Sequence, residues 1–282
     1  MLNKNELENL KLIVFDLDGT LLDDEGQIGN ETKKLIYELK GLGIQFTFAT
    51  KRPMSSLSEY VGELKLETPI ISLDGALIQN HSGKTTVFES FVPEKYVLKS
   101  LNLADKFSLK ICLCLSDAIY YTKANSSIPE LLDKFGAVFK EIPSYDKLVS
   151  KSLEVVIAGE QIEMLSYVNS RLRFPASIGL DTSFFKSDFR PGVYYLEVRK
   201  GGSSKGNSLK RLVKFLKINL RQTAVIGDWY NDISLFNTRA IKIAVANAVP
   251  EIKQLADFIT GRSNNEEGVA EFLDIVLKYK KG

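Results

Sequence analysis

The sequence predicts an α/β protein in which a doubly wound parallel sheet is interrupted by an inserted α+β segment. Three observations support this prediction. Strand and helix patterns alternate over roughly the first 75 residues, which is the signature of parallel strands joined by helices. From about residue 76 to residue 193, hairpins and consecutive strands replace that alternation. The alternation resumes near residue 203 and continues to the end of the chain.

The first expected strand ends in two carboxylates. Leu12 to Phe15 form an unbroken apolar run, as expected for a strand buried on both faces of a parallel sheet. Asp16 and Asp18 follow, and in an extended chain residues two apart point to the same side. Such a pair is costly unless a cation lies between the carboxylates or one is protonated. Taken alone, Asp-Leu-Asp-Gly could equally be a strand running into a polar turn.

The next elements continue the alternation. We expect a helix from Asn30, whose side chain would cap it and whose apolar residues follow the helical period. A strand is expected over Ile44–Thr50, and Pro53 would begin a further helix. Pro69–Leu73 is the third expected strand. These elements form a β-α-β-α-β series, which is typical of a doubly wound sheet.

In the middle of the chain, strands and helices no longer alternate regularly. Residues 76–80 and 85–91 flank a polar turn and predict a hairpin. The strands expected over 110–115 and 118–122 are joined by a short turn, which favours antiparallel pairing. We therefore predict a Rossmann-like core formed by residues 1–82 and 194–282, with an inserted α+β domain at residues 83–193.

The C-terminal part returns to alternating helices and strands. Lys205 would begin a helix, and Thr223–Ile226 would form a strand that ends at Asp228. A further strand is expected over Ile241–Val245, and the last helix would follow Gly268. The predicted parallel core is thus split by the insertion.

Composition excludes several classes of function. The 282 residues carry a net charge of +2, which gives no reason to expect nucleic acid or a membrane as partner. The polar N-terminal segment lacks the apolar core of a signal peptide. The two cysteines, Cys112 and Cys114, are too close in a strand for a disulfide. We expect free thiols, a cytoplasmic location, and a monomer or weak homodimer.

Polar side chains collect at the ends of several expected elements. They are Asp16, Asp18, Thr50, Lys51, Lys205, Asp228, Asn231 and Asp232. If these ends converge at one edge of the sheet, carboxylate oxygens would suit Mg²⁺ and a phosphate oxygen. A lysine and a hydroxyl can position and neutralise a transferring phosphoryl group. One carboxylate can act as nucleophile and a second as general acid and base. The sequence therefore predicts metal-assisted phosphoryl transfer.

The chain resembles the haloacid dehalogenase superfamily of phosphatases, specifically its Cof-type sugar-phosphatase branch. Four short motifs of that family occur in order. They are Asp16-Leu17-Asp18-Gly19-Thr20, Phe48-Ala49-Thr50, Lys205-Gly206 and Gly227-Asp228-Trp229-Tyr230-Asn231-Asp232. Further matches are Ser72-Leu73-Asp74-Gly75-Ala76, Ala246-Asn247-Ala248 and Asn265-Glu266-Glu267-Gly268-Val269-Ala270. The resemblance extends over nearly the whole chain.

The resemblance implies roles for the motif residues in the chemical step. Asp16 resembles the family's nucleophile, which also binds Mg²⁺ through its other oxygen. Asp18 resembles the general acid and base, with its backbone carbonyl on the metal. Asp228 matches the metal ligand of the fourth motif. Lys205 matches the residue that neutralises the transferring phosphate.

The resemblance also implies how the substrate is held. Thr50 and Lys205 would bind the phosphate, together with the backbone N–H of Lys51. Asn231 would orient the phosphate, and Asp232 would act from behind the metal ligands by orienting metal-bound water. The inserted domain resembles the family's α/β cap, which closes over the site and selects the leaving group. The expected partner is a small phosphorylated metabolite.

Four positions, at three places in the chain, depart from the family pattern. Lys51 stands where Cof-type proteins usually carry Gly, and Asp74 stands where they usually carry Asn. Trp229 and Tyr230 replace residues that are often small. These departures bear on the identity of the substrate more than on the chemistry.

The predicted function is a Mg²⁺-dependent phosphatase that hydrolyses small phosphomonoesters, with sugar phosphates as the leading class, through an aspartyl-phosphate on Asp16. One alternative is a phosphotransferase or phosphomutase, which would pass the phosphoryl group to a sugar hydroxyl. The other alternative is a non-catalytic binding protein. Phosphate release without an added acceptor separates the hydrolase from both.

Overall fold

The chain divides into two compact units. The computed structural model describes residues 3–132, 136–174, 179–187 and 190–281. Unit 1 consists of Met1–Lys51, Ser58–Phe88 and Ser204–Gly282, and unit 2 consists of Arg52–Leu57 and Glu89–Ser203. Within these described residues, none of the helices is both long and apolar enough for a membrane span.

Unit 1 contains a parallel sheet of five strands in the order β14-β13-β12-β1-β2. Every neighbouring pair is parallel, and all residues of β1 are buried, which confirms the α/β prediction. The strands are β1 (Leu12–Phe15), β2 (Gln45–Phe48), β12 (Thr223–Gly227), β13 (Ile241–Ala244) and β14 (Phe258–Ile259). Because the strands are parallel, their carboxyl ends meet at one edge of the sheet.

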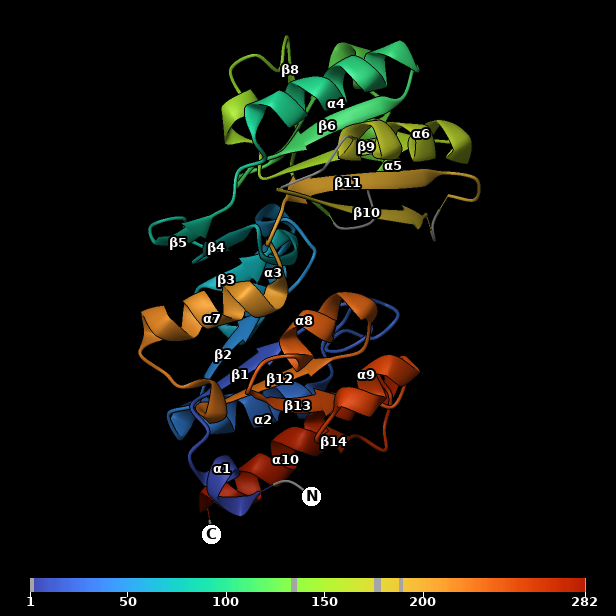
Figure 1. Ribbon diagram of the computed structural model, residues 1–282. Coiled ribbons are helices and arrows are strands. Elements are labelled where there is room, and N and C mark those ends of the chain that lie inside the picture. Colours follow the sequence, from blue (N-terminus) through green and yellow to red (C-terminus); the bar gives the residue numbers. More distant parts are fainter. Residues whose placement is uncertain (1–2, 133–135, 175–178, 188–189, 282) are drawn as a thin grey trace. The chain divides into compact units, whose positions relative to one another are not determined.

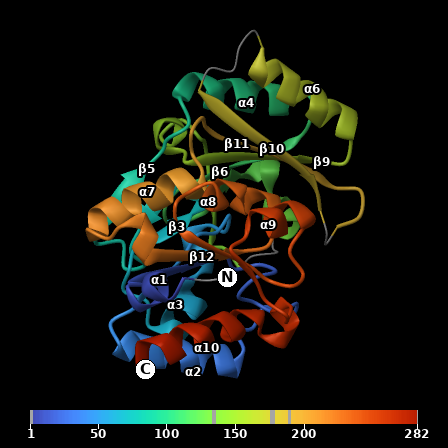
Figure 2. The same cartoon turned by 60° about the horizontal axis from the view of Figure 1, so that its bottom comes forward.

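Helices cover both faces of this sheet (Figures 1 and 2). On one side α2 (Asn30–Gly41) packs against α10 (Gly268–Lys281), and on the other α7 (Lys205–Leu216) packs against α8 (Ile233–Phe236). The core is therefore doubly wound. The remaining helices of unit 1 are α1 (Lys4–Glu8), α3 (Ser58–Leu64) and α9 (Pro250–Leu255).

The expected hairpin forms, as part of a second, three-stranded sheet. Its strands are β3 (Ile70–Ser72), β4 (Leu77–Gln79) and β5 (Thr86–Glu89), in that order. A single parallel bridge between Ala49 and Ile71 joins β3 to the end of β2. This bridge places the turn after β3 beside the end of β2.

Two expected helix starts are wrong. The N-cap of α2 is Gly29, without a side-chain hydrogen bond, so Asn30 is not the cap. Instead, the Glu267 carboxylate accepts hydrogen bonds from the backbone N–H of Thr32 at 2.7 Å and from its hydroxyl at 2.9 Å. Pro53 does not begin an α-helix, because a short 3-10 turn intervenes before α3 begins at Ser58.

Unit 2 contains a six-stranded sheet in the order β10-β11-β9-β6-β7-β8, antiparallel except between β7 and β8. Its helices α4 (Glu94–Lys106) and α6 (Ile162–Arg173) both pack on β9, and Cys112 and Cys114 are free and buried. The other elements are β6 (Lys110–Cys114), β7 (Ile119–Thr122), α5 (Ile128–Leu131), β8 (Phe139–Ile142), β9 (Glu154–Gly159), β10 (Leu180–Lys186) and β11 (Tyr194–Lys200).

Strand β11 corrects one expected boundary. The sequence predicts that residues from 194 onward belong to the parallel core, but β11 lies between β9 and β10 in the sheet of unit 2. The long segment of unit 2 begins after Phe88 rather than after residue 82 and ends at Ser203, and Arg52–Leu57, expected in the core, also belongs to unit 2. The apolar pattern of β11 suits either sheet, and only its pairing partners decide between them.

Candidate active site

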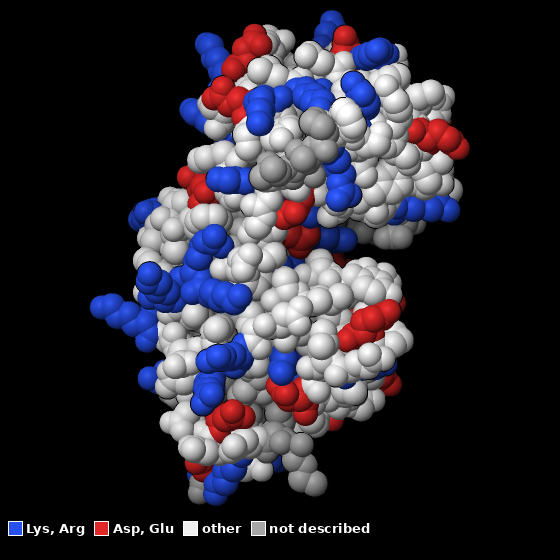
Figure 3. Space-filling view, viewed as in Figure 1, with Lys and Arg blue, Asp and Glu red and all other residues white. Residues whose placement is uncertain are grey.

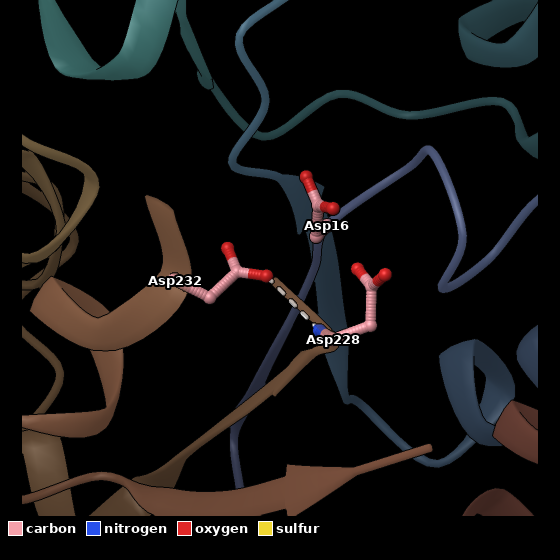
Figure 4. Close-up of side chains that lie close together, drawn as sticks. All are labelled: Asp16, Asp228 and Asp232. Atoms are coloured by element: carbon pink, nitrogen blue, oxygen red, sulfur yellow. Dashed lines mark hydrogen bonds between the residues drawn. The ribbon is translucent and has the colours of Figure 1, made fainter. Parts of the chain in front are cut away.

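Three buried carboxylates lie together at the carboxyl edge of the parallel sheet (Figure 4). Asp16 follows β1 and Asp228 follows the neighbouring strand β12, while Asp232 ends the 3-10 turn η7 (Tyr230–Asp232). One oxygen from each lies within 4.8 Å of the others. Their exposed fractions are 4%, 6% and 0%. We call Asp16, Asp228 and Asp232 the acidic triad.

The ammonium group of Lys205 joins two members of the triad. Its Nζ donates to Asp16 Oδ1 at 2.6 Å and to Asp232 Oδ1 at 2.8 Å, and its side chain is fully buried. The other cations of α7 (Lys210, Arg211 and Lys214) are exposed, and Figure 3 shows basic side chains gathered over the surface where α7 lies. Lys205 lies in the first turn of this helix. It differs from the surface cations of α7 because it is buried and bonded to two carboxylates.

The turn after β1 positions the carboxylate of Asp228. The Thr20 hydroxyl donates to Asp228 Oδ1 at 2.8 Å, and the backbone N–H of Asp228 donates to Asp232 Oδ2 at 3.1 Å. Gly19 has a φ of +76°, and a Cβ there would lie 2.6 Å from Asp228 Oδ2. Only glycine permits this close approach.

The triad is electrostatically unfavourable without a cation. Burial, reinforced by the charge of Asp232, raises the pKa of Asp16 well above its usual value against the opposing effect of Lys205. Burial and Asp232 likewise raise the pKa of Asp228 to about 6. Burial opposes the charged form of Lys205, but Asp16 and Asp232 overcome it, so the lysine pKa is raised. One ammonium is set against three carboxylates, so the cluster favours a further positive charge.

The residues present fit a divalent cation. The triad offers only oxygen donors, close together and buried, which is the donor set that Mg²⁺ prefers. One carboxylate oxygen of Asp232 lies within 4.8 Å of those of Asp16 and Asp228, and its role behind the metal ligands stays a prediction. Asp18 lies in the turn after β1 and is half-buried, and its carboxylate is not part of the triad.

The residues expected to hold phosphate lie beside the triad's strands. Thr50 is fully buried at the end of β2, and its carbonyl accepts from the backbone N–H of Asp74 at 3.0 Å. Lys51 follows it and is half-buried. Asn231, in η7, donates from Nδ2 to Asp74 Oδ1 at 3.2 Å. The ends of β2 and β12 are thus connected through Asp74.

A family model for haloacid dehalogenase-like hydrolases matches residues 13–273. The chain belongs to the haloacid dehalogenase-like hydrolase family. Phosphatase YwpJ from Bacillus subtilis is 28% identical, over 95% of this chain and 100% of its own length. The 5-amino-6-(5-phospho-D-ribitylamino)uracil phosphatase YitU of the same organism is 24% identical, over 93% of this chain and 96% of its own.

A solved structure agrees with this assignment. A haloacid dehalogenase-like hydrolase from Bacteroides thetaiotaomicron superposes with a TM-score of 0.82 and 26% identity, covering 95% of this chain and 99% of its own. The matched residues 13–273 include the segment that forms unit 2, so this segment is shared with the family. Together with its relatives, the family identifies the chain as a phosphoric monoester hydrolase acting on small phosphate substrates.

Sequence reasoning missed supporting residues of this hydrolase. Thr20 belongs to the first motif, which by itself suggests no role for it, but its hydroxyl donates a hydrogen bond to Asp228. Asn247 belongs to a further motif, and its Nδ2 donates to the carbonyl of Gly19 at 2.7 Å while its Oδ1 accepts from the N–H of Asn264 at 2.9 Å. Their presence in family motifs was the only signal, because each acts on a residue far away in the sequence.

The raised carboxyl pKa values predict that a divalent cation at the acidic triad would bind in a pH-dependent way. A cation needs ionised ligands, so protonation of Asp228, with its pKa of about 6, competes with it. We expect Mg²⁺ affinity, measured by titration calorimetry, to be roughly tenfold weaker at pH 5 than at pH 7.5. The stability of the metal-free protein should depend on pH in the opposite direction. The native state binds this proton more tightly than the unfolded chain, so the free energy of unfolding should rise as pH falls through about 6.

The Asp228→Asn variant is the control for this pH effect. It keeps the shape of the side chain but cannot titrate, so its residual Mg²⁺ affinity should change less between the two pH values. Equal Mg²⁺ affinity of the unaltered protein at both pH values would contradict the competition between metal and proton.

Proposed function

We propose that this hydrolase is a Mg²⁺-dependent phosphatase that acts on small phosphomonoesters through an aspartyl-phosphate on Asp16. The observation that carries the proposal is the buried triad with Lys205 bonded to both Asp16 and Asp232 at the carboxyl edge of the sheet. A nucleophilic carboxylate, a fixed cation and a pair of neighbouring acidic ligands are what phosphoryl transfer through an aspartyl-phosphate requires.

Asp16 and Asp228 would hold the metal, together with the backbone carbonyl of Asp18 that the family pattern implies. The carboxylate of Asp232 lies close enough to the other two to support the same ion. When bound, Mg²⁺ would supply the positive charge that allows these carboxylates to stay ionised and that neutralises phosphoryl oxygens. This role accounts for glycine at position 19, since a larger residue would displace Asp228.

The reaction then proceeds in two steps. An Asp16 oxygen attacks the phosphorus, and the bond between phosphorus and the ester oxygen breaks while Asp18 gives its proton to the leaving alcohol. Asp18 next takes a proton from a water molecule, which attacks the aspartyl-phosphate and releases inorganic phosphate. The Lys205 ammonium keeps Asp16 in place and neutralises charge on the transferring group.

Thr50, the N–H of Lys51 and Asn231 are the groups that we assign to the phosphate oxygens. Sugar and polyol phosphates are the proposed substrate class, supported by the relative whose named substrate carries a phosphorylated ribityl group. We assign selection of the leaving group to unit 2, an insertion with a sheet and an apolar core of its own.

The test is phosphate release from a panel of phosphomonoesters, with Mg²⁺ and with EDTA. The panel holds hexose, pentose and polyol phosphates, nucleotides, pyridoxal phosphate and an aryl phosphate. We expect release that EDTA abolishes and Mg²⁺ restores, with sugar or polyol phosphates turned over fastest.

Other outcomes of the panel contradict the proposal. Release that persists in EDTA would remove the metal dependence. Transfer of the phosphoryl group to an added sugar acceptor, without release of inorganic phosphate, would identify a phosphotransferase or phosphomutase. Neither phosphate release nor transfer to an acceptor, from folded protein, would favour a binding protein.

A further inference from the structure

The turn after β3 has an unusual backbone. Leu73, Asp74 and Gly75 have φ values of 48°, 49° and 95°, so three successive residues lie in the left-handed region. Glycine adopts this region readily, whereas leucine and aspartate pay a steric penalty there. Such strain persists only where surrounding contacts impose it, and it concentrates at functional sites.

Contacts to three parts of the active site impose this conformation. The N–H of Asp74 donates to the carbonyl of Thr50 at 3.0 Å. The hydroxyl of Ser208, in the helix that begins with Lys205, donates to the carbonyl of Gly75 at 2.7 Å. Asn231 Nδ2 donates to Asp74 Oδ1 at 3.2 Å. The turn therefore connects the phosphate-binding strand end, the lysine helix and η7.

The bond between Asp74 and Asn231 has a chemical consequence. A carboxylate only accepts hydrogen bonds, whereas a carboxamide presents an acceptor at one end and two donor hydrogens at the other. The nitrogen end of Asn231 must therefore face Asp74. With asparagine at position 74, as is usual in the resembling family, either orientation of the Asn231 amide could be paired.

We propose that Asp74 is a positioning residue that fixes the carboxamide of Asn231 with its nitrogen toward Asp74, which leaves the second N–H for an oxygen of the substrate phosphate. This inference rests on the proposed function, in which Asn231 binds phosphate. The charge of Asp74 also adds to those of Asp16 and Asp232 in raising the pKa of Lys205, so the same carboxylate helps to keep the lysine an ammonium ion.

The decisive variant is Asp74→Asn. Asparagine tolerates the left-handed conformation well, so the turn should keep its backbone and only the fixed orientation of Asn231 is lost. We expect the Kd of inorganic phosphate, measured by calorimetry with Mg²⁺ present, to rise roughly fivefold to tenfold. When Asn231 is already replaced by alanine, Asp74→Asn should change the phosphate Kd by less than about twofold or lower it. In that background the substitution removes only a negative charge.

A matched pair elsewhere in unit 1 controls for generic effects. Asp24 accepts from Asn265 Nδ2 at 2.9 Å, and the Asp24 residue is exposed. Asp24→Asn, alone and with Asn265→Ala, should leave the phosphate Kd within about twofold of the unaltered protein.

Two outcomes would overturn the inference. One is an equal change in phosphate Kd from Asp74→Asn with and without Asn231, and the other is no phosphate binding by the unaltered protein. A protein that binds phosphate with the expected coupling but hydrolyses no ester would refute the phosphatase and leave the role of Asp74 standing.

Discussion

Asp16→Asn should lower kcat by about 10,000-fold or more. The carboxamide has nearly the shape of the carboxylate but is a poor nucleophile, so the aspartyl-phosphate cannot form at a useful rate. The measurement is phosphate release from the best ester of the panel, with enzyme at high concentration so that residual turnover is detected.

The same variant should fold normally. Burial and the charge of Asp232 disfavour the ionised form of Asp16, and replacing it with a neutral group removes that penalty. Lys205 keeps its bond to Asp232. Without metal we therefore expect a free energy of unfolding equal to or above that of the unaltered protein. Asp257→Asn, at a partly exposed ion pair with Lys242, is the matched control and should retain full activity. Activity of Asp16→Asn within tenfold of the unaltered protein would refute its role as nucleophile.

Lys205→Met should affect both activity and stability. Loss of the ammonium removes the charge that faces the transferring phosphoryl group, and we expect kcat to fall by about 1,000-fold or more. The substitution also leaves Asp16 and Asp232 buried together without their shared cation. Removing one partner of a buried ion pair costs about 3–5 kcal/mol, so the free energy of unfolding in EDTA should fall by that amount.

Two conditions should partly restore the stability of Lys205→Met. Protonation of the carboxylates relieves their repulsion, so the loss should be smaller at pH 5 than at pH 8. Added Mg²⁺ should relieve the same repulsion at pH 8. Lys242→Met is the control. Lys242 Nζ lies 3.2 Å from Asp257 Oδ1, and the Asp257 side chain is 44% exposed. A pair near the surface contributes less than about 1 kcal/mol to stability. Equal destabilisation by the two lysine substitutions would contradict the structural role of Lys205.

Several strands and helices that local patterns predict are confirmed. The apolar run of β1 predicts a buried strand that ends at Asp16, and the helical period after Lys205 predicts α7 with its lysine in the first turn. The strand before Asp228 follows from the same kind of pattern. Because parallel strands present their carboxyl ends at one edge, the meeting of these residues follows from the fold class.

Features that depend on contacts between distant segments could not be predicted. The cap of α2 comes from Glu267, 235 residues beyond Thr32, so the local choice of Asn30 was reasonable but wrong. Strand β11 joins the sheet of unit 2 through its partners, although its apolar pattern suits either sheet.

The active site also has features that single motifs predict and features that depend on tertiary packing. Residue types and spacing within single motifs predicted that Asp16, Asp228 and Lys205 lie at the ends of their elements, because each motif lies on one element whose geometry is regular; their chemical roles stay a prediction. The place of Asp232 among the possible metal ligands and the pairing of Asp74 with Asn231, 157 residues apart, depend on where the elements pack. Local periodicity carries the direction of a side chain along its own strand or helix, whereas the partner that it meets is set by packing across the whole core.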